Sequence, residues 1–558
     1  MDSKIPVKPL MAAFGSSRFK LPKLALLCLV GLAQVGPARV SLSRMRADLD
    51  YLCSEKLQGR ASLSPGADLA AGYIASAFEK AGLLPATAEG GFLQPFPLVA
   101  TVTPSPATSR QSKAGDRART TLALVREGTH TDFRLGADFR TGFWRPIGIS
   151  ASVAFVGYGI TAPEYGYDDY AGIDVTGKVV LVFDHEPQET DSRSVFNGTG
   201  HTRYANSRVK ADNARLHGAL AMTIVSEPLR KHAGTFDPTP RAAGKPSLRA
   251  TAPRQALDDS SIPTVSVSDR TAAELLRSSG RTPAELQTAI DHDLKPKSML
   301  LPDTTIQFSA AQPDARRGQS ANVVGRLEGS DPQLRRETIL VTAHYDHLGV
   351  QNGRLYPGAN DNASGTVAVM ELARLFAGSA VRPRRSLLFV VFGSEEEGLL
   401  GSYYYVAHPL RPLATTRAVL NLDMIARDEA HIPQSRGVVE IPPDTRNEIN
   451  LVGAFYSRDL EGVIRKANEK VGLEIGTKFD RDHDLNVLFR CDHFPFLLHD
   501  VPAVWIFGGF HPGYHEPSDT IDRLDFPKLE KVVRLTYESA RSLADAPSAP
   551  RFHVALGQ

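Results

Sequence analysis

The sequence TILVTAHYDHLG, residues 338–349, decides the fold, because an apolar run ends in histidine and aspartate. An apolar run without polar alternation is typical of a strand that is buried on both faces of a sheet. Further strands of this kind are expected at 386–392, 418–422 and 503–507, and histidines or carboxylates close or follow each of them. The sequence therefore predicts an open α/β sheet whose polar residues gather beyond the carboxyl ends of the strands.

Helices are expected between these strands, since apolar residues recur there at three- and four-residue spacing. The expected helices span residues 40–53, 66–81, 364–376, 459–471 and 527–544, with a shorter one near 398–406. Strands covered on both faces and alternating with helices predict an α/β/α sandwich built on a mixed sheet.

The expected elements become shorter from about residue 149 onward, which indicates a second, smaller α/β domain inserted into the first. Short strands are expected at 152–160, 178–183, 219–225 and 263–267, with helices near 204–217 and 271–279. The insert shows no cluster of catalytic residue types, and its polar segment 186–202 is expected to be an exposed loop. The expected domains are the N-terminal part of the catalytic domain at 40–145, the insert at 146–285, a linker at 286–318 and the main catalytic part at 319–548.

Length and composition describe a globular protein with more than one core. The chain has 558 residues, of which 42% are hydrophobic and 23% charged, and its net charge is +2. This charge does not favour nucleic acid or an anionic membrane as a partner. Residues 1–33 are expected to be a secretory signal, because Arg18, Lys20 and Lys23 precede an apolar run at 24–33 that is too short to span a bilayer.

Removal of this signal would take away five basic residues and one acidic residue, leaving a mature chain of charge near −2. The expected product is a secreted or periplasmic protein with no stable membrane span. Cys28 would leave with the signal, so Cys53 and Cys491 remain. The sequence favours two separate thiols over a disulfide, because two cysteines so far apart in the sequence do not form the pattern of a disulfide-stabilised domain.

Five polar pieces fall beyond or at the ends of the expected strands. They are His344 with Asp346, Asp361, Glu395 with Glu396, Asp423, and His515. Two histidines with carboxylates and no cysteine suit a catalytic zinc or a related ion, and not a structural zinc site. The set is enough for two ions only if one carboxylate bridges them. One of the two adjacent glutamates would be a ligand and the other a general base.

In order along residues 321–545, these pieces resemble the di-zinc exopeptidase family through its pattern His-x-Asp, Asp-Asn, Glu-Glu, Asp and His-x-Pro-x-Asp-Thr. That family includes secreted bacterial leucyl aminopeptidases, plasma glutamate carboxypeptidase and the glutamate carboxypeptidase/transferrin receptor group. The helices within 43–85 resemble the N-terminal part of the same catalytic domain. The insert resembles a protease-associated (PA) domain.

The resemblance implies two Zn²⁺ ions, with Co²⁺ or Mn²⁺ as substitutes. It assigns His344 and Asp423 to one ion, Glu396 and His515 to the other, and Asp361 to both as the bridge. His511 competes with His515 on spacing alone, but the tail Pro517-Ser518-Asp519-Thr520 favours His515. In the family the peptide bond after the bridging aspartate is often cis, and here that bond is Asp361–Asn362.

The same resemblance gives the catalytic roles. Glu395 would be the general base, and Asp346 would orient His344. His347, although next to the motif, is expected to be structural. Asp492 and His493 match a loop that borders the substrate pocket in relatives, so contact with substrate is a hypothesis for both.

The expected function is that of a metallo-exopeptidase that removes the N-terminal residue of a peptide. The rival function within the class is a dipeptidase or carboxypeptidase of the glutamate carboxypeptidase type, although no arginine cluster for a terminal carboxylate is evident. Two further functions fall outside the class, a one-zinc glutaminyl cyclase and a non-enzymatic, receptor-like binding protein, and the complete ligand set argues against both. The oligomeric state, the native metal and the preferred side chain stay open.

Overall fold

The computed structural model describes residues 39–87, 90–101, 120–141, 146–230, 254–255, 262–310 and 315–554. The signal predicted for residues 1–33, with Cys28, lies outside these residues. Within them, no helix combines the length and the apolar character that crossing a membrane requires.

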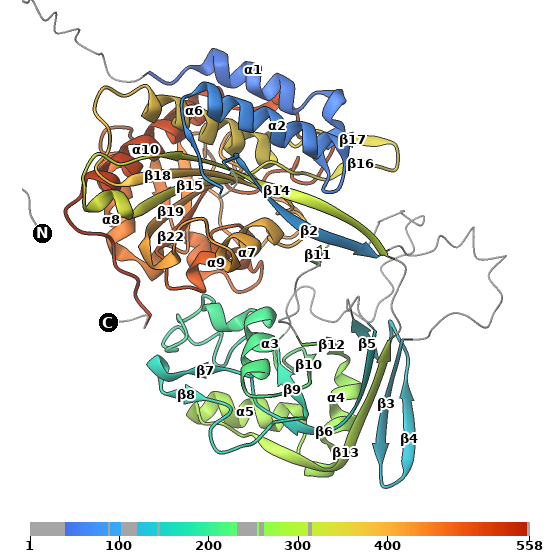
Figure 1. Cartoon of the computed structure of the whole chain (residues 1–558). Coiled ribbons are helices and arrows are strands. Elements are labelled where there is room, and N and C mark those ends of the chain that lie inside the picture. The colour runs from blue at the N-terminus through green and yellow to red at the C-terminus, as the bar shows by residue number, and fades with distance from the viewer. Residues whose placement is uncertain are drawn as a thin grey trace, which may run out of the picture. The chain divides into compact units, whose positions relative to one another are not determined.

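A mixed sheet carries the main domain (Figure 1). Its strands are β1 (Leu84–Pro85), β2 (Leu93–Thr101), β11 (Arg254–Gln255), β14 (Ala315–Leu327), β15 (Thr338–His344), β18 (Ser386–Phe392), β19 (Thr416–Asp423), β20 (Glu448–Val452), β21 (Glu474–Gly476) and β22 (Ala503–Phe507). They follow the order β11-β2-β14-β18-β15-β19-β22-β20-β21, with β1 beside β14. The central strands β18, β15, β19 and β22 are parallel, whereas β14 and β20 run antiparallel to them. The strands predicted from the apolar runs are confirmed.

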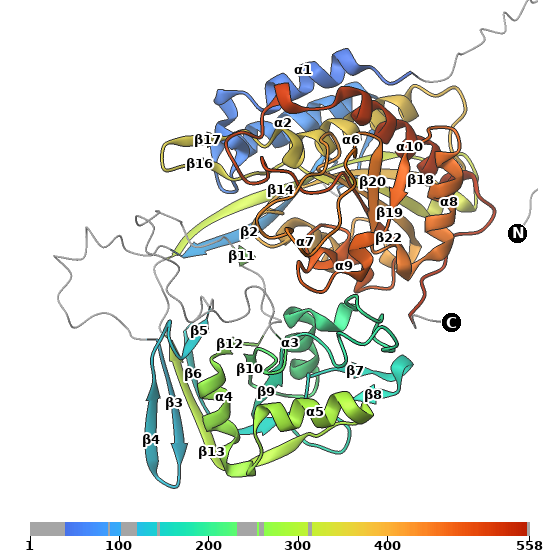
Figure 2. The same cartoon turned by 180° about the vertical axis from the view of Figure 1, so that it is seen from behind.

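Helices cover both faces of this sheet (Figures 1 and 2). They are α1 (Leu42–Leu52), α2 (Pro65–Lys80), α6 (Gly365–Ala377), α8 (Arg458–Asn468) and α10 (Phe526–Asp545) on one face, and α7 (Leu400–Ala407) and α9 (Phe494–Leu497) on the other. Successive residues of a strand point to opposite faces, so Val341 packs with α6 and α10 while Leu340 packs in the core beneath α7 and α9. The predicted α/β/α sandwich with a mixed sheet is confirmed.

Local sequence fixes where these helices begin. Ser64 precedes Pro65, and its side chain accepts a hydrogen bond from the backbone N–H of Ala67 at 3.3 Å. The carboxylate of Asp525 accepts from the N–H of Lys528 in the same way. Such caps satisfy backbone donors that have no partner in the first helical turn, so both helices start close to the predicted positions.

A second mixed sheet forms the inserted domain. Its strands are β3 (Thr121–Arg126), β4 (Thr129–Phe133), β5 (Phe139–Thr141), β6 (Ile147–Phe155), β9 (Val179–Phe183), β10 (Ala221–Val225), β12 (Thr264–Val267) and β13 (Met299–Ala310), in the order β4-β3-β13-β6-β9-β10-β12-β5. Helix α3 (Ser207–Leu216) packs on one face, and α4 (Asp269–Leu276) and α5 (Pro283–Asp293) pack on the other. Two short hairpins complete the described strands: β7 (Thr161–Ala162) with β8 (Tyr167–Asp168), and β16 (Gly349–Gln351) with β17 (Arg354–Tyr356).

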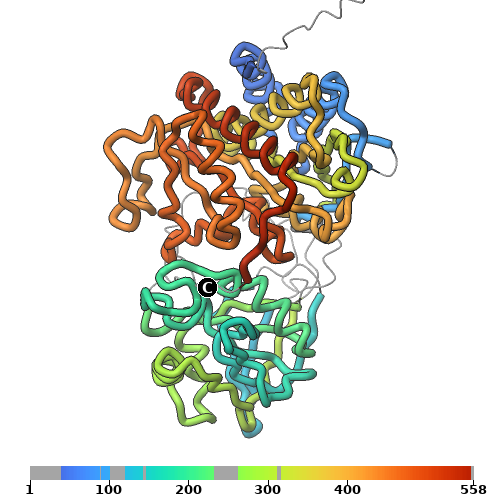
Figure 3. The backbone as a smooth tube through the Cα atoms, turned by 90° about the vertical axis from the view of Figure 1, so that its left-hand side faces the viewer, coloured from blue at the N-terminus to red at the C-terminus, as the bar shows by residue number. Residues whose placement is uncertain are grey.

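This sheet differs from the predicted domain boundaries. Strands β3 to β5 precede residue 146, and β13 lies inside the segment 286–318 that was expected to be a linker. Exposed and buried residues alternate along most of β13, a pattern of a strand with one solvated face that Pro302 interrupts. Figure 3 shows that the cyan and green segments build this domain, whereas blue and yellow-to-red segments build the main one.

The segment 186–202 also differs from the expectation of an exposed loop. Glu186, Glu189, His201 and Thr202 are all buried. Their polar groups meet one another, since both oxygens of Glu186 accept hydrogen bonds from Thr202. The polar composition of the segment 186–202 therefore did not make these four residues exposed, because buried polar side chains can form hydrogen bonds within the fold.

Arg60 joins the N-terminal helices to the main sheet. This residue is fully buried, and its guanidinium donates to four carbonyl oxygens: Leu52 at 2.6 Å, Tyr345 at 2.7 Å, Pro357 at 2.8 Å and Gly358 at 3.0 Å. In return, the Arg60 carbonyl accepts from the N–H of His347 at 3.2 Å. One side chain thus ties together the segment after β15 and the turn before α6.

We expect Arg60→Met to lower the free energy of unfolding by about 3 kcal/mol or more, since each hydrogen bond from a charged donor contributes about 1.5–3 kcal/mol and the four buried acceptors would lose their donor. The measurement is the urea midpoint followed by circular dichroism. The matched control is Arg46→Met on the exposed face of α1, where a change within about 0.5 kcal/mol is expected. Equal effects of the two substitutions would contradict the role of Arg60.

Candidate metal centre

The predicted site residues meet at one edge of the main sheet. His344 and Asp423 are the last residues of β15 and β19, and the Glu395–Glu396 turn follows β18. Asp361 lies in the turn 359–364 before α6, and His515 lies in the loop after β22. The carboxyl ends of parallel strands lie at the same edge of a sheet, which brings together side chains from distant parts of the chain.

The first half of the site is built around His344. Its Nε2 atom lies 3.5 Å from Asp361 Oδ1, 3.5 Å from Asp423 Oδ1 and 3.7 Å from Glu395 Oε2. Among the described residues, His344 Nε2 and Asp423 Oδ1 have no hydrogen-bond partner although both are buried. Two ligand atoms of one tetrahedral zinc ion are about 3.4 Å apart, so the donor atoms fit such an ion.

The second half is built around His515. Its Nε2 atom lies 3.1 Å from Asp361 Oδ2 and 3.1 Å from Glu396 Oε2. Asp361 therefore presents one oxygen to His344, which also faces Asp423, and the other to His515, which also faces Glu396. This is the arrangement that a carboxylate bridging two ions requires. The imidazole of His515 is 36% exposed, so solvent reaches the site from this side.

His347 belongs to the site more directly than the sequence indicated. Its Nδ1 atom lies 2.7 Å from Glu396 Oε1 and 3.9 Å from Asp361 Oδ2. Together with the buried Asp361 and the half-buried Glu396, His347 forms a second group of metal-ligand types, beside the buried group of His344, Glu395 and Asp423. Its place next to Asp346, immediately beyond a strand end, is the signal that could have found it.

His511 lies elsewhere. Its Nε2 atom is 3.0 Å from Asn360 Nδ2, and its Nδ1 accepts from the N–H of Gly513 at 3.1 Å. Burial lowers the pKa of His511 to about 3. The preference for His515 over His511 therefore agrees with the geometry.

Asp519 holds the backbone that carries Asp361. Its Oδ2 atom accepts from the N–H groups of Asn360 and Asp361, both at 3.0 Å. The peptide bond Asp361–Asn362 is cis, as expected. The motif that distinguishes His515 from His511 thus also supplies the group that orients the central carboxylate.

Asp346 contacts the backbone of both adjacent glutamates, Glu395 and Glu396. Its carboxylate accepts from the N–H of Glu395 at 3.0 Å and from that of Glu396 at 3.3 Å. Nδ1 of His344 lies 3.2 Å from the carbonyl oxygen of Asp346 and 3.7 Å from its Oδ1. Asp346 therefore orients His344 mainly through its backbone, and the Glu395–Glu396 turn through its carboxylate.

Asp492 and His493 are fully buried. Asp492 accepts a hydrogen bond from the hydroxyl of Ser402, and burial lowers the pKa of His493 to about 3. Their neighbour Cys491 donates to Asp423 Oδ2 at 3.2 Å. The structure thus places this segment behind Asp423 and away from solvent. Cys491 and Cys53 are both free thiols, which confirms the expectation of separate cysteines.

The adjacent glutamates have opposite pKa shifts. Burial raises the pKa of Glu395 well above its usual value; His344 opposes the rise, and Asp492 and Glu396 add to it. Burial and Asp361 also act to raise the pKa of Glu396, but His515 and His347 hold it at about 2. Groups whose pKa values are separated in this way are suited to different tasks. The two side chains therefore differ in their affinity for a proton although they are adjacent in the sequence.

Comparisons with known proteins agree with this chemistry. Residues 322–540 match the sequence model described as Peptidase family M28. Aminopeptidase YwaD of Bacillus subtilis is 28% identical over 223 residues, which are 37% of this chain and 42% of that protein. A probable zinc metalloprotease of Leptosphaeria maculans is 25% identical over 51% of this chain and 68% of its own. A probable lipoprotein aminopeptidase of Mycobacterium tuberculosis is 27% identical over 48% of this chain and 49% of its own.

The matched part of this chain thus spans less than half the length of two of these three relatives. Among solved structures, an aminopeptidase from Aneurinibacillus sp. strain AM-1 is similar over 92% of this chain and 96% of its own, with 20% identity and a TM-score of 0.47. A zinc aminopeptidase from Bacillus subtilis is similar over 93% of this chain and 99% of its own, with 18% identity and a TM-score of 0.42.

We expect Asp361→Asn to lower the zinc content by two ions per chain, because its two oxygens face both halves of the site. Asp423→Asn, which touches one half only, should lower it by one. The measurement is zinc per chain by inductively coupled plasma mass spectrometry after removal of loosely bound metal. An Asp361→Asn variant that keeps the wild-type zinc content would contradict the bridging assignment.

Proposed function

We propose that this chain, whose residues 322–540 match peptidase family M28, is a zinc-dependent aminopeptidase that hydrolyses the N-terminal peptide bond of peptides. The single observation that supports this proposal most strongly is the position of Asp361 between two pairs of ligand types, with Glu395 beside them. A binding protein that had lost its activity would not need this complete set of groups.

In this proposal, His344 and Asp423 would hold one zinc ion, Glu396 and His515 would hold the other, and Asp361 would contribute to both. His347 keeps Glu396 in place through its 2.7 Å contact. When bound, two zinc ions supply Lewis acidity, which makes water a nucleophile near neutral pH and polarises the carbonyl of the scissile bond. Co²⁺ or Mn²⁺ would supply similar chemistry from the same nitrogen and oxygen ligands.

Glu395 handles the proton. Its Oε2 atom lies 3.7 Å from Nε2 of His344, and burial raises its pKa, so the ionised carboxylate binds a proton more strongly than that of an exposed glutamate. It would accept the proton of the attacking water and pass it to the amine of the departing peptide. The two hydrogen bonds from the backbone to Asp346 fix the turn from which Glu395 reaches the reacting atoms.

The remaining parts of the proposal concern the setting of the site. The insert would be a PA-type domain that borders the peptide-binding side, and residues 1–33 would direct the chain to a secreted or periplasmic location. Asp492 and His493 would support the site from behind Asp423, since neither is exposed. A carboxypeptidase would need cationic side chains that bind the terminal carboxylate of its substrate. Arg427 is a cationic side chain near the site, but it faces the carboxylate of Asp519 at 3.8 Å.

We expect Glu395→Gln to lower kcat by about 10²–10⁴-fold, the usual contribution of general acid–base catalysis, while zinc content stays that of the wild type. Glutamine keeps the size of the side chain and cannot carry the proton. The matched control is Glu397→Gln in the same turn, outside both ligand groups, with kcat within about twofold. Near-normal turnover of Glu395→Gln would remove this residue from the role of base.

The direction of cleavage is tested with a short peptide that has a free N-terminus and with its N-acetylated form, followed by mass spectrometry. Release of one N-terminal residue from the free peptide only, abolished by a chelator and restored by zinc, is the expected result. Release of the C-terminal residue from both peptides would assign the chain to the carboxypeptidase type. Cleavage of neither peptide under any metal would favour a receptor-like binding protein.

A further inference from the structure

A second group of metal-ligand types lies in the inserted domain, in the segment 184–206 that connects β9 to α3. His185, Glu189 and His201 are buried there, with exposed fractions of 4%, 1% and 1%. One ligand atom of each lies within 4.8 Å of the others. From this geometry, we propose that His185, Glu189 and His201 bind a zinc ion that holds the segment 184–206 in place against the catalytic domain.

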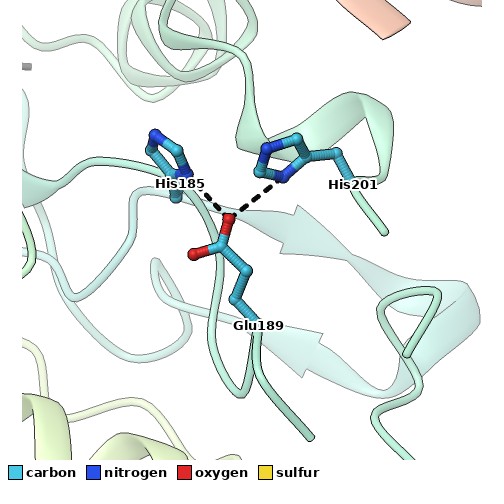
Figure 4. Close-up of side chains that lie close together, drawn as sticks. All are labelled: His185, Glu189 and His201. Atoms are coloured by element: carbon cyan, nitrogen blue, oxygen red, sulfur yellow. Dashed lines mark hydrogen bonds and ion pairs between the residues drawn. The ribbon is translucent and has the colours of Figure 1, made fainter. Parts of the chain in front are cut away.

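The two imidazoles converge on a single carboxylate oxygen. His185 Nδ1 lies 2.8 Å from Glu189 Oε1, and His201 Nδ1 lies 3.3 Å from the same oxygen. Figure 4 shows both rings above this oxygen, one to its left and one to its right, each joined to it by a dashed line. The ring centroids are 5.0 Å apart and the planes are inclined by 67°. Ligand atoms of one zinc ion lie about 3.4 Å apart, so small side-chain shifts allow all three atoms to bind one ion.

The surroundings support a cation at the Oε1 side of Glu189. The other oxygen, Oε2, faces Arg230 at 3.8 Å. That arginine lies closer to Glu227, at 3.1 Å, and forms an ion pair with Asp291 as well. Arg230 therefore shares its charge among three carboxylates and faces Oε2 of Glu189, whereas the two histidines contact Oε1.

The ligand chemistry favours zinc. Two imidazole nitrogens and one carboxylate oxygen suit Zn²⁺, whereas Ca²⁺ and Mg²⁺ prefer oxygen ligands. The second ring nitrogen of His185, Nε2, lies 4.0 Å from the carboxylate of Asp184. This separation is too long for a hydrogen bond, so Asp184 would add negative charge beside the ring without fixing its orientation. Water would complete the coordination of the ion.

The segment that the ion would hold contacts the catalytic domain at several points. The ring of His201 lies 5.3 Å from that of Phe489, and His483 Nδ1 lies 2.8 Å from the carbonyl oxygen of Thr199. A Cβ atom at Gly200 would come within 2.2 Å of the Asp480 carbonyl oxygen, so the two backbones touch. Arg203 donates its N–H to the hydroxyl of Tyr456 at 2.8 Å.

These contacts give the ion a role that differs from catalysis. The segment 480–489, against which 184–206 packs, leads directly into Cys491, whose thiol donates to the candidate ligand Asp423. An ion at His185, Glu189 and His201 would thus fix the insert next to the chain that supports Asp423, and would contact no reacting atom. This site is structural, and its existence does not depend on the proposed peptidase activity.

The test is the zinc content of the full-length chain. His201→Phe keeps an aromatic ring beside Phe489 and removes the ligand nitrogen, and Glu189→Gln keeps the shape and removes the charge. Each should hold one zinc ion fewer per chain than the wild type, by mass spectrometry of the metal. The matched control is His217→Phe, also in the insert, where the imidazole stacks on Tyr170 at 4.1 Å; it should keep the wild-type zinc content.

Hydrogen exchange gives a second measurement that does not require activity. A chelator should speed exchange of the 184–206 peptides in the wild type, and Glu189→Gln should show fast exchange with or without chelator. Two results would overturn the proposal and leave a purely hydrogen-bonded cluster. One is an equal zinc content in the wild type and both variants. The other is a chelator-induced increase in the exchange rate of 184–206 that is the same in the wild type and in Glu189→Gln. A wild-type chain that holds the zinc ion of the insert but cleaves no peptide would count against the proposed function only.

Discussion

Repulsion among buried carboxylates is the constraint that the structure of the site has to satisfy. Asp361, Glu395, Glu396 and Asp423 lie within a few ångströms of three imidazoles, with little exposure to solvent. Burying a charge without compensation costs several kcal/mol. The opposite pKa shifts of Glu395 and Glu396 are the visible consequence, and positive charge from divalent ions is the compensation that these ligand types are suited to accept.

Holding such groups together requires a scaffold that does not relax, and the chain supplies it at three levels. The parallel strands bring the side chains to one edge. Backbone donors then fix the carboxylates: Asp519 orients the turn of Asp361, and Asp346 orients the glutamate turn. Finally, Arg60 fastens the segments that carry both turns to the N-terminal helices. Each level is local in space and distant in sequence, which explains why the main domain needs residues from both sides of the insert.

The sequence predicted the main fold and the meeting of the candidate ligands at one edge of the sheet, because both follow from local patterns. Apolar runs define the central strands, and each candidate ligand stands at a fixed offset from one of them. What it did not predict depends on contacts between distant segments. The contact of His347 with Glu396 is not visible in any motif. The boundaries of the insert were misplaced because β13 contains a proline and alternates between exposed and buried residues. The segment 186–202 was expected to be exposed because its polar residues are distant in sequence from the partners that they contact in the fold.

The connection of the insert to the main sheet has a consequence for how the chain reaches this fold. The last residue of β2, Thr101, pairs with the first residue of β14, Ala315. Topologically, β2 and β14 are a hairpin whose turn has been replaced by an entire domain. The entropy of closing a loop grows only with the logarithm of its length, and a domain that folds first shortens the effective loop further. Such a junction accepts a large module without disturbing the strands on either side. The main sheet can therefore form completely only after the whole insert has been synthesised, because β2 precedes the insert and β14 follows it.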